Sequence, residues 1–164
     1  IHSILEQFKN YYMKIYTLKK EQFVPTNMET CWDFFSQPKN LQTITPPYMG
    51  FKILHGAAER MYPGQIIEYK VSPVLNIPMQ WVTEIKHVVD NKLFVDNQMI
   101  GPYKLWHHKH FFEVKENGVL MTDIVHYALP FGILGQIAHA LFVKKQLQTI
   151  FDYREQKVIE LFGK

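Results

Sequence analysis

The chain has 164 residues, of which 47% are hydrophobic and 20% charged. This is enough for one compact domain and too apolar for a disordered chain. The formal charge is +3, and the positive residues are scattered without a long Lys/Arg run, which argues against a nucleic-acid surface. Aromatic residues make up 15% of the chain and are accompanied by eight histidines. Such a share of rings predicts either a dense core or a large ring-lined pocket.

Several segments bear on location and redox state. No stretch of about 18 apolar residues occurs, so we expect no integral membrane span. Residues 1–12 lack the pattern of a signal peptide, and we expect them to be an N-terminal extension of a single domain, residues 13–164. Cys31 is the only cysteine, which excludes an intrachain disulfide and fits a reducing cytoplasm. We expect it to be a buried structural thiol rather than a nucleophile.

The first predicted elements are a strand over 14–24, ended by Pro25, and a short helix from Met28 to about Ser36. The residues before this helix fit a capping box, in which the Thr26 side chain caps the helix start and Glu29 reaches back. A second short helix is expected over 39–44, before a proline pair.

From residue 51 the pattern changes to strands separated by turn residues. Six strands are predicted, over 51–56, 64–72, 79–88, 92–100, 104–115 and 119–129. Since short turns join adjacent strands, we expect an antiparallel meander. A long helix over 131–162 should follow, with an apolar stripe of Leu134, Ile137, Ala138, Leu141, Leu147, Phe151, Val158 and Leu161.

These elements predict an α+β chain with a helix-grip fold. A curved antiparallel sheet must cover its apolar inner face, and only the last helix, roughly 45 Å long at 1.5 Å per residue, is long enough to do so. The two short helices after the first strand would close one end. This arrangement leaves a cavity between the sheet and the C-terminal helix.

Strand alternation and turn positions predict which residues face that cavity. A turn at Gly101-Pro102-Tyr103 would place Asp96 opposite His108 and Phe94 opposite His110. A turn at Asn117-Gly118 would place Phe112 opposite Asp123 and His110 opposite Val125. On this register, polar groups and rings share one inner face, namely Tyr69, Trp81, Phe94, Asp96, Gln98, Trp106, His108, His110, Asp123 and Tyr127.

The C-terminal helix adds two further candidates to the ligand-binding set, Phe151 on its apolar stripe and Arg154 one turn later. The arginine side chain has two interpretations. It makes an ion pair or hydrogen bonds at the end of the cavity, or it anchors the carboxylate of a ligand.

The histidine pair allows several chemical interpretations. His108 and His110 with Asp96 have ligand types that zinc or iron accept, but a buried His–Asp pair also satisfies itself, and we expect no metal. A histidine held by Asp96 could act as a general base, and we favour instead a polar network that orders the pocket. The sequence has no nucleophile elbow and no phosphate-binding glycine loop, so we expect no nucleophilic serine and no cofactor.

Several spaced motifs together resemble a known family over about residues 13–162. They are Trp32-x-Phe34-Phe35-Ser36, Gly101-Pro102-Tyr103, Trp106-x-His108-x-His110-x-Phe112, Asp123-x-Val125-x-Tyr127-x-x-Pro130-x-Gly132-x-x-Gly135 and Phe151-Asp152-Tyr153-Arg154. The constellation resembles bacterial SRPBCC proteins of the START and birch-pollen-allergen-like superfamily, near the polyketide cyclase/dehydrase group. The resemblance implies a helix-grip fold with a deep hydrophobic cavity.

Three functions remain open at this point. The first is a cytoplasmic carrier or sensor of a small hydrophobic molecule, such as a lipid, a polyketide-like or an aromatic compound. The second is a cyclase or dehydratase acting on a polyketide-like carbonyl substrate, with His108 or His110 as the base. The third is a protein-interaction module with a filled core. The sequence does not define the ligand or the oligomeric state, and fold resemblance does not choose between these functions.

Overall fold

The computed structural model describes residues 13–73 and 77–163, so the predicted extension over 1–12 lies outside the described residues. Within this part of the chain, seven antiparallel strands form one sheet in the order β1-β7-β6-β5-β4-β3-β2. The strands are β1 (Tyr16–Val24), β2 (Lys52–His55), β3 (Ile66–Val71), β4 (Met79–Val89), β5 (Leu93–Ile100), β6 (Leu105–Lys115) and β7 (Gly118–Ala128). The predicted meander is therefore confirmed, with β1 added at the free edge of β7.

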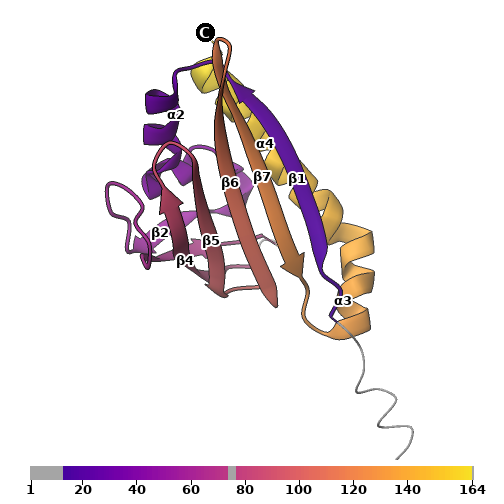
Figure 1. The fold of residues 1–164 in the computed structure, drawn as a ribbon. Helices are drawn as coiled ribbons and strands as arrows, with labels where there is room; N and C mark the ends of the chain where they lie inside the picture. The colour runs from indigo at the N-terminus through magenta and orange to yellow at the C-terminus, as the bar shows by residue number, and fades with distance from the viewer. Residues whose placement is uncertain (1–12, 74–76, 164) are drawn as a thin grey trace, which may run out of the picture.

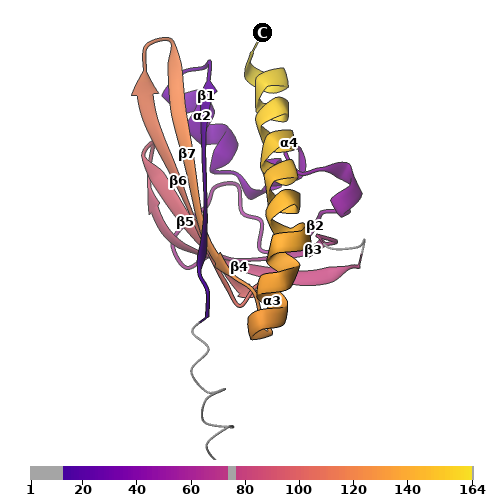
Figure 2. The same ribbon diagram turned by 90° about the vertical axis from the view of Figure 1, so that its right-hand side faces the viewer.

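Helical segments cover the inner side of this sheet. They are α2 (Met28–Phe35), η2 (Pro38–Gln42), η3 (Pro47–Met49), α3 (Gly132–Ala138), η4 (His139–Val143) and α4 (Lys144–Phe162). The sheet bends around α4 (Figure 1), with β7 and β1 on one side and β4 and β3 passing behind its lower half in Figure 2. The predicted helix-grip architecture is confirmed.

The start of α2 differs from the prediction in its cap. Asn27 is the residue before the helix, and its Oδ1 accepts a hydrogen bond from the backbone N–H of Thr30 at 2.8 Å. The prediction of a Thr26 cap was wrong because the helix begins at Met28, so the capping position falls one residue later. The second short helix is the 3₁₀ segment η2, and a further one, η3, follows where the proline pair was expected only to end a helix.

The long C-terminal helix is continuous but not uniform, because η4 is a π-helical segment between α3 and α4. Downstream of it, Leu147 and Phe151 are buried against the sheet. Leu134, upstream of η4, and Leu141, within it, belong to the predicted stripe but are 72% and 64% exposed. The prediction of one continuous inward stripe was therefore wrong. A π turn holds more residues than an α turn, so it rotates the residues before it relative to those after it.

The strand registers decide which side chains meet. Asp96 lies opposite His108 as predicted. Between β6 and β7, however, His110 lies opposite Asp123 and Phe112 opposite Met121, two residues away from the predicted register. The turn residues between β6 and β7 are Glu116 and Asn117, not Asn117-Gly118, and Asn117 supplies the positive φ of 64°. Side chains alternate between the two faces of a strand with a period of two. The two-residue difference in register therefore changes which residues pair across β6 and β7 but leaves each side chain on its predicted face.

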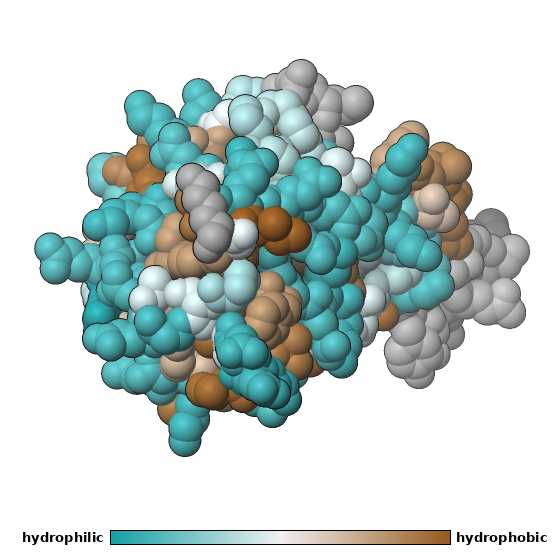
Figure 3. All heavy atoms as spheres, turned by 90° about the horizontal axis from the view of Figure 1, so that it is seen from above, coloured by the Kyte–Doolittle hydropathy of each residue, from teal (hydrophilic) through white to brown (hydrophobic). Residues whose placement is uncertain are grey.

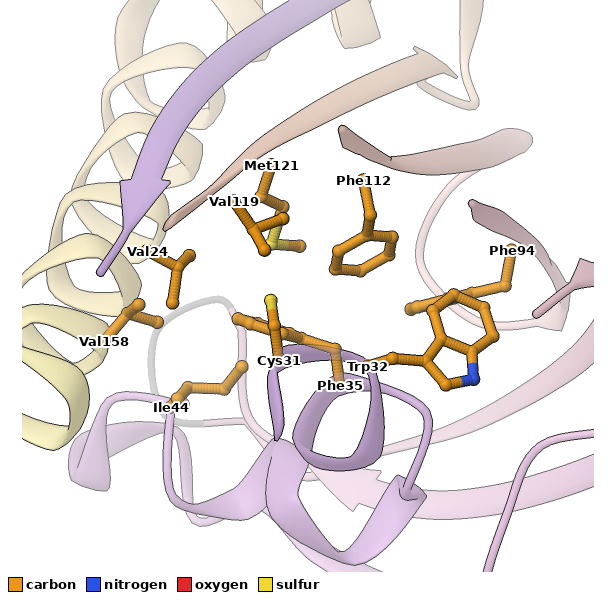
Figure 4. Close-up of a cluster of buried hydrophobic side chains, with 10 residues drawn as sticks. All are labelled: Val24, Cys31, Trp32, Phe35, Ile44, Phe94, Phe112, Val119, Met121 and Val158. Carbon is orange, nitrogen blue, oxygen red and sulfur yellow. The ribbon is translucent and has the colours of Figure 1, made fainter. Parts of the chain in front are cut away.

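A cluster of buried apolar side chains closes the end of the sheet beneath α2 (Figure 4). The Trp32 ring packs edge-on against Phe112, with 5.4 Å between ring centroids, and against Phe94 at 6.1 Å. Cys31 is fully buried in this cluster, and burial raises the pKa of its thiol to about 12. The expectation of a buried thiol is therefore confirmed, and its raised pKa disfavours the reactive thiolate.

Candidate functional site

A cavity of about 160 Å³ lies between the concave face of the sheet and α4. One water needs roughly 10–15 Å³ on such a scale, so the space is an order of magnitude larger than a single water site. Side chains of α2, η2 and the loop after it close one end of the cavity, and α4 contributes Leu147, Ile150, Phe151 and Arg154 to its wall.

Nine of the twelve residues predicted to form the site line this cavity. They are Tyr69, Trp81, Phe94, Asp96, Trp106, His108, His110, Phe151 and Arg154. The agreement follows from strand alternation, because β3, β4, β5 and β6 each turn one face toward α4.

The other three predicted residues have different positions. Gln98 shares the inner face, but its side chain bends to the turn after β5, where it donates to the Tyr103 carbonyl at 2.7 Å and accepts from the Tyr103 N–H at 3.2 Å. Asp123 lies behind the cavity wall, bonded to the histidines. The Tyr127 hydroxyl is bonded to His139 at 2.9 Å. Buried polar groups need partners, and these side chains have found theirs within the protein.

One wall of the cavity is an aromatic cluster that includes a residue missed by the sequence reasoning. Tyr103 lies in the loop between β5 and β6, 4.7 Å from the Trp106 ring and 5.7 Å from the Trp81 ring. Burial raises the pKa of the Tyr103 hydroxyl. The alternation of side chains assigns a face only to residues within strands, so the sequence did not indicate that the loop residue Tyr103 faces the cavity. The Gly101-Pro102-Tyr103 turn was recognised for its geometry and not for its ring.

The polar side of the cavity is a closed arrangement of two histidines and two aspartates. His110 donates from Nε2 to Asp96 Oδ2 at 2.9 Å, and its Nδ1 lies 2.7 Å from Asp123 Oδ1, in a direction that is not that of an ideal hydrogen bond. His108 donates from Nε2 to Asp123 Oδ1 at 3.0 Å, and its Nδ1 is 3.7 Å from Asp96 Oδ2. The two imidazole rings are 3.7 Å apart between centroids.

The surroundings of the two histidines shift their pKa values in opposite directions. Burial acts to lower the pKa of His110, but the charge of Asp123 and the hydrogen bonding of the ring to both aspartates outweigh it and raise the pKa. Both ring nitrogens of His110 face carboxylates, which accept and do not donate, as suits an imidazolium. Burial and the neighbouring charge of His110 lower the pKa of His108. These surroundings favour the neutral form of His108, and Nε2 is the nitrogen that lies within hydrogen-bond distance of Asp123.

The carboxylates are held in the charged form. Burial acts to raise the pKa of both aspartates, but the hydrogen bonds and positive charges around them prevail and lower it, with His110 the largest contributor in each case. Arg154 adds a further charge, since its Nη1 is 3.9 Å from Asp123 Oδ2. The guanidinium also lies over the Phe151 ring at 5.0 Å. Its Nε is buried and has no hydrogen-bond partner among the described residues.

From the sequence, we expect no metal ion at this place, although the residue types would allow zinc or iron. One nitrogen or oxygen each of Asp96, His108 and His110 lies within 4.8 Å of the others, which is the spacing of a ligand set. However, the ring nitrogens are turned toward carboxylates and the positive Arg154 adjoins the cluster. The donor set thus satisfies itself, and the absence of a metal stays a prediction.

None of the described helices is both long enough and apolar enough to cross a membrane.

The chain is similar to known proteins in its three-dimensional structure only. No family model matches the sequence, and no curated protein matches it. Among solved structures, protein CV1439 from Chromobacterium violaceum matches with a TM-score of 0.68 and 12% identity, over 90% of this chain and 98% of that one. A norcoclaurine synthase from Thalictrum flavum, solved as a point mutant with a transition-state analogue, matches at 0.63 and 14%, over 91% and 97%.

A third similar structure is longer. A nucleoside-diphosphate sugar epimerase from Corynebacterium glutamicum matches with a TM-score of 0.63 and 24% identity, over 87% of this chain and 28% of that one. The chain has the helix-grip fold, as the order of predicted strands and helices indicated. At these identities the likeness establishes the fold and leaves the function to the site itself.

Proposed function

We propose that the protein binds a small hydrophobic molecule in the cavity between the sheet and α4, as a carrier or sensor in the cytoplasm. The observation that supports this most directly is the cavity of about 160 Å³, bounded mainly by rings and aliphatic side chains. A protein-interaction module with a filled core would leave space for no more than a few waters, so the volume weighs against that alternative. Ligand pockets typically combine apolar walls with a few fixed polar groups.

The polar groups of the cavity suggest how the ligand is oriented. The carboxylates of Asp96 and Asp123 are engaged by the histidines, while the Arg154 Nε–H has no partner among the described residues. An unpaired buried donor is unfavourable by about 1–3 kcal/mol. We propose that a carbonyl or carboxylate oxygen of the ligand accepts from Arg154, while its apolar part lies against Trp81 and Trp106.

The test uses a naphthalene-sulfonate dye, whose fluorescence rises in apolar surroundings. Ile85 is buried and lines the cavity, so Ile85→Trp fills the space, whereas Ile66→Trp places the same ring on the exposed face of β3. We expect dye binding to fall at least ten-fold in Ile85→Trp and to stay unchanged in Ile66→Trp. Native mass spectrometry of the purified protein should also show a small apolar adduct. Equal dye binding by the two variants, with no adduct, would refute the proposal.

A second candidate function, cyclisation or dehydration of a polyketide-like carbonyl compound, is favoured by one observation. His108 lines the cavity with Nε2 held by Asp123, and its lowered pKa keeps Nδ1 unprotonated near neutral pH. Such a nitrogen is suited to remove a proton next to a carbonyl. The environment of His110 favours the charged form and suits it instead to stabilise a developing negative charge.

Proton removal can be tested without knowing the substrate. The probe is 2-tetralone in D₂O, and NMR follows the loss of its α-protons. If His108 is the base, exchange above the buffer rate should fall at least a hundred-fold in His108→Gln, because base catalysis contributes about 10²–10⁴-fold. Phe23→Leu, on the exposed side of β1, is the control. Exchange at the buffer rate in the unmodified protein would count against this candidate and would leave ligand binding unaffected.

A further inference from the structure

The segment between β7 and α4 exposes an unusual run of apolar side chains. The exposed fraction is 82% for Phe131, 72% for Leu134, 64% for Leu141 and 62% for Phe142, and Ile133 and Ile137 are also exposed. Elsewhere, in the view from above, most of the surface is hydrophilic, and hydrophobic side chains reach it at separate places (Figure 3). We name these six residues the α3 patch. Contiguous exposed apolar patches mark interaction sites or membrane contacts.

In the part of the chain that the structure describes, the charged side chains that line the hollows beside the α3 patch are lysines. No Asp or Glu occurs between Asp123 and Asp152 in the sequence, whereas Lys144 and Lys145 follow the patch directly. The groove between α3 and β1 is lined by Lys14, Lys19 and Lys144, and a neighbouring hollow beside Phe131 is lined by Lys14 and Lys104. Among residues 13–73 and 77–163, no acidic side chain lines either of them. The patch is therefore apolar at its centre and basic at its edge.

The backbone holds the most exposed ring of the patch in a costly conformation. Phe131 has a φ of 67°, in the left-handed region that a bulky side chain rarely adopts. Its side chain is mostly exposed, so the free energy gained by burying it does not offset this strain. Strained residues that persist are concentrated at functional sites.

We propose that the α3 patch docks the protein on the surface of an anionic lipid bilayer. Phe131, Leu134 and Leu141 would enter the boundary between headgroups and acyl chains, while the lysines contact lipid phosphates. An apolar face flanked by lysines is the combination that holds peripheral helices at a membrane surface. This inference does not depend on what occupies the cavity.

Charge favours a bilayer over a second copy of the chain. A two-fold dimer brings the same patch of both subunits together, so it would place the Lys144 and Lys145 pairs close to each other with no acidic partner in the patch. Anionic lipids supply the missing negative charge.

The experiment is co-sedimentation of the full chain with vesicles of phosphatidylglycerol and phosphatidylcholine in equal parts, compared with phosphatidylcholine alone. We expect binding to the anionic vesicles only, and weaker binding as salt rises. Leu134→Ser should lower the affinity about ten-fold or more, and Lys144→Gln about five-fold. Val114→Ser is the matched control, because Val114 is 67% exposed and lies at the far end of β6.

Three results would overturn the proposal. The first is no sedimentation with anionic vesicles, and the second is equal loss of binding in Leu134→Ser and Val114→Ser. The third is a dimer in light scattering that Leu134→Ser converts to a monomer, since a second copy would then cover the patch. Circular dichroism of each variant should match the unmodified protein, because every changed side chain is exposed.

Discussion

The Nδ1 atom of His110 lies 2.7 Å from Oδ1 of Asp123, the residue directly opposite it on β7. The same imidazole reaches Asp96 on the other neighbouring strand through Nε2. One histidine on β6 therefore joins carboxylates of the two strands that flank it, β5 and β7. This contact carries both the charge distribution of the site and part of the cohesion of the sheet.

The first prediction concerns the charge of the two histidines. In an NMR titration, His110 should show a pKa above the ordinary value of 6.5 and His108 a pKa below it. Asp123→Asn should lower the pKa of His110, because it removes the largest favourable charge beside that ring. Asp90→Asn, in the exposed turn after β4, should leave both values unchanged. A titration in which the order of the two histidines is reversed would contradict this assignment.

The second prediction is the loss of stability when the buried contact is broken. Asp123→Ala removes the carboxylate that His110 and Arg154 share, and removing one partner of a buried ion pair costs about 3–5 kcal/mol. Urea unfolding measures this free energy. Asp90→Ala, at an exposed turn, should change it by less than about 0.5 kcal/mol. Similar losses in the two variants would mean that the cluster does not stabilise the fold.

The third prediction is the direction of the pH dependence. The pKa values of Asp96 and Asp123 are lower in the folded protein than their ordinary 3.8, so their contribution is present above that pH and is lost as the pH falls through the folded values. His110 acts in the opposite direction, since its raised pKa contributes stability below pH 6.5 that is lost as the pH rises through the folded value. The urea midpoint of the unmodified protein should fall on acidification below about pH 4.

Asp96→Asn provides the comparison for the acid side of this profile. The variant lacks one of the two carboxylates with a lowered pKa, so its urea midpoint should change less between pH 5 and pH 3. A midpoint that changes as much in Asp96→Asn as in the unmodified protein would exclude Asp96 as a contributor.

The fourth prediction separates two candidate caps of α2. Asn27→Ala removes the side chain that accepts the Thr30 N–H and should destabilise the protein by about 1 kcal/mol. Thr26→Ala should change the stability by a few tenths of that value at most. Thermal unfolding of the two variants side by side distinguishes them, and a larger effect at Thr26 would restore the capping box.

The fifth prediction follows from the strained backbone at Phe131. Asparagine tolerates a positive φ better than phenylalanine, so Phe131→Asn should raise the free energy of unfolding by about 1 kcal/mol. Leu134→Asn, at an equally exposed helical position, should instead lower it slightly because asparagine is the poorer helix former. If both substitutions destabilise alike, Phe131 makes contacts that its exposure does not indicate.

The residues that face the cavity could be predicted from the sequence, because a register error of two residues leaves every side chain on the same face of its strand. The expected pairing of Phe112 with Asp123 was wrong by two residues, yet His108, His110 and Asp123 still lie close together. A slip by one residue would have turned the histidines to solvent. The fold was predictable for a similar reason, since the turns and the long final helix admit few arrangements.

Other features depend on tertiary geometry that local patterns do not encode. Gln98 lies on the predicted face, but the turn after β5 offers its amide two backbone partners, and the side chain follows them. Tyr103 reaches the cavity from a loop, where no periodicity applies. The π turn shifts the helical phase without any proline or glycine to mark it within 139–143.

This π turn has a mechanical consequence for the molecule. His139, its first residue, stacks on Tyr16 with 3.5 Å between ring centroids and is bonded to Tyr127, whose ring adjoins Tyr103 in the cavity wall. A rotation of α3 about this point would have to move or break the contacts of His139 with Tyr16 on β1 and Tyr127 on β7. The π-helical segment η4 is thus also the place where the exposed helix α3 is connected, through His139, to side chains in the interior of the protein.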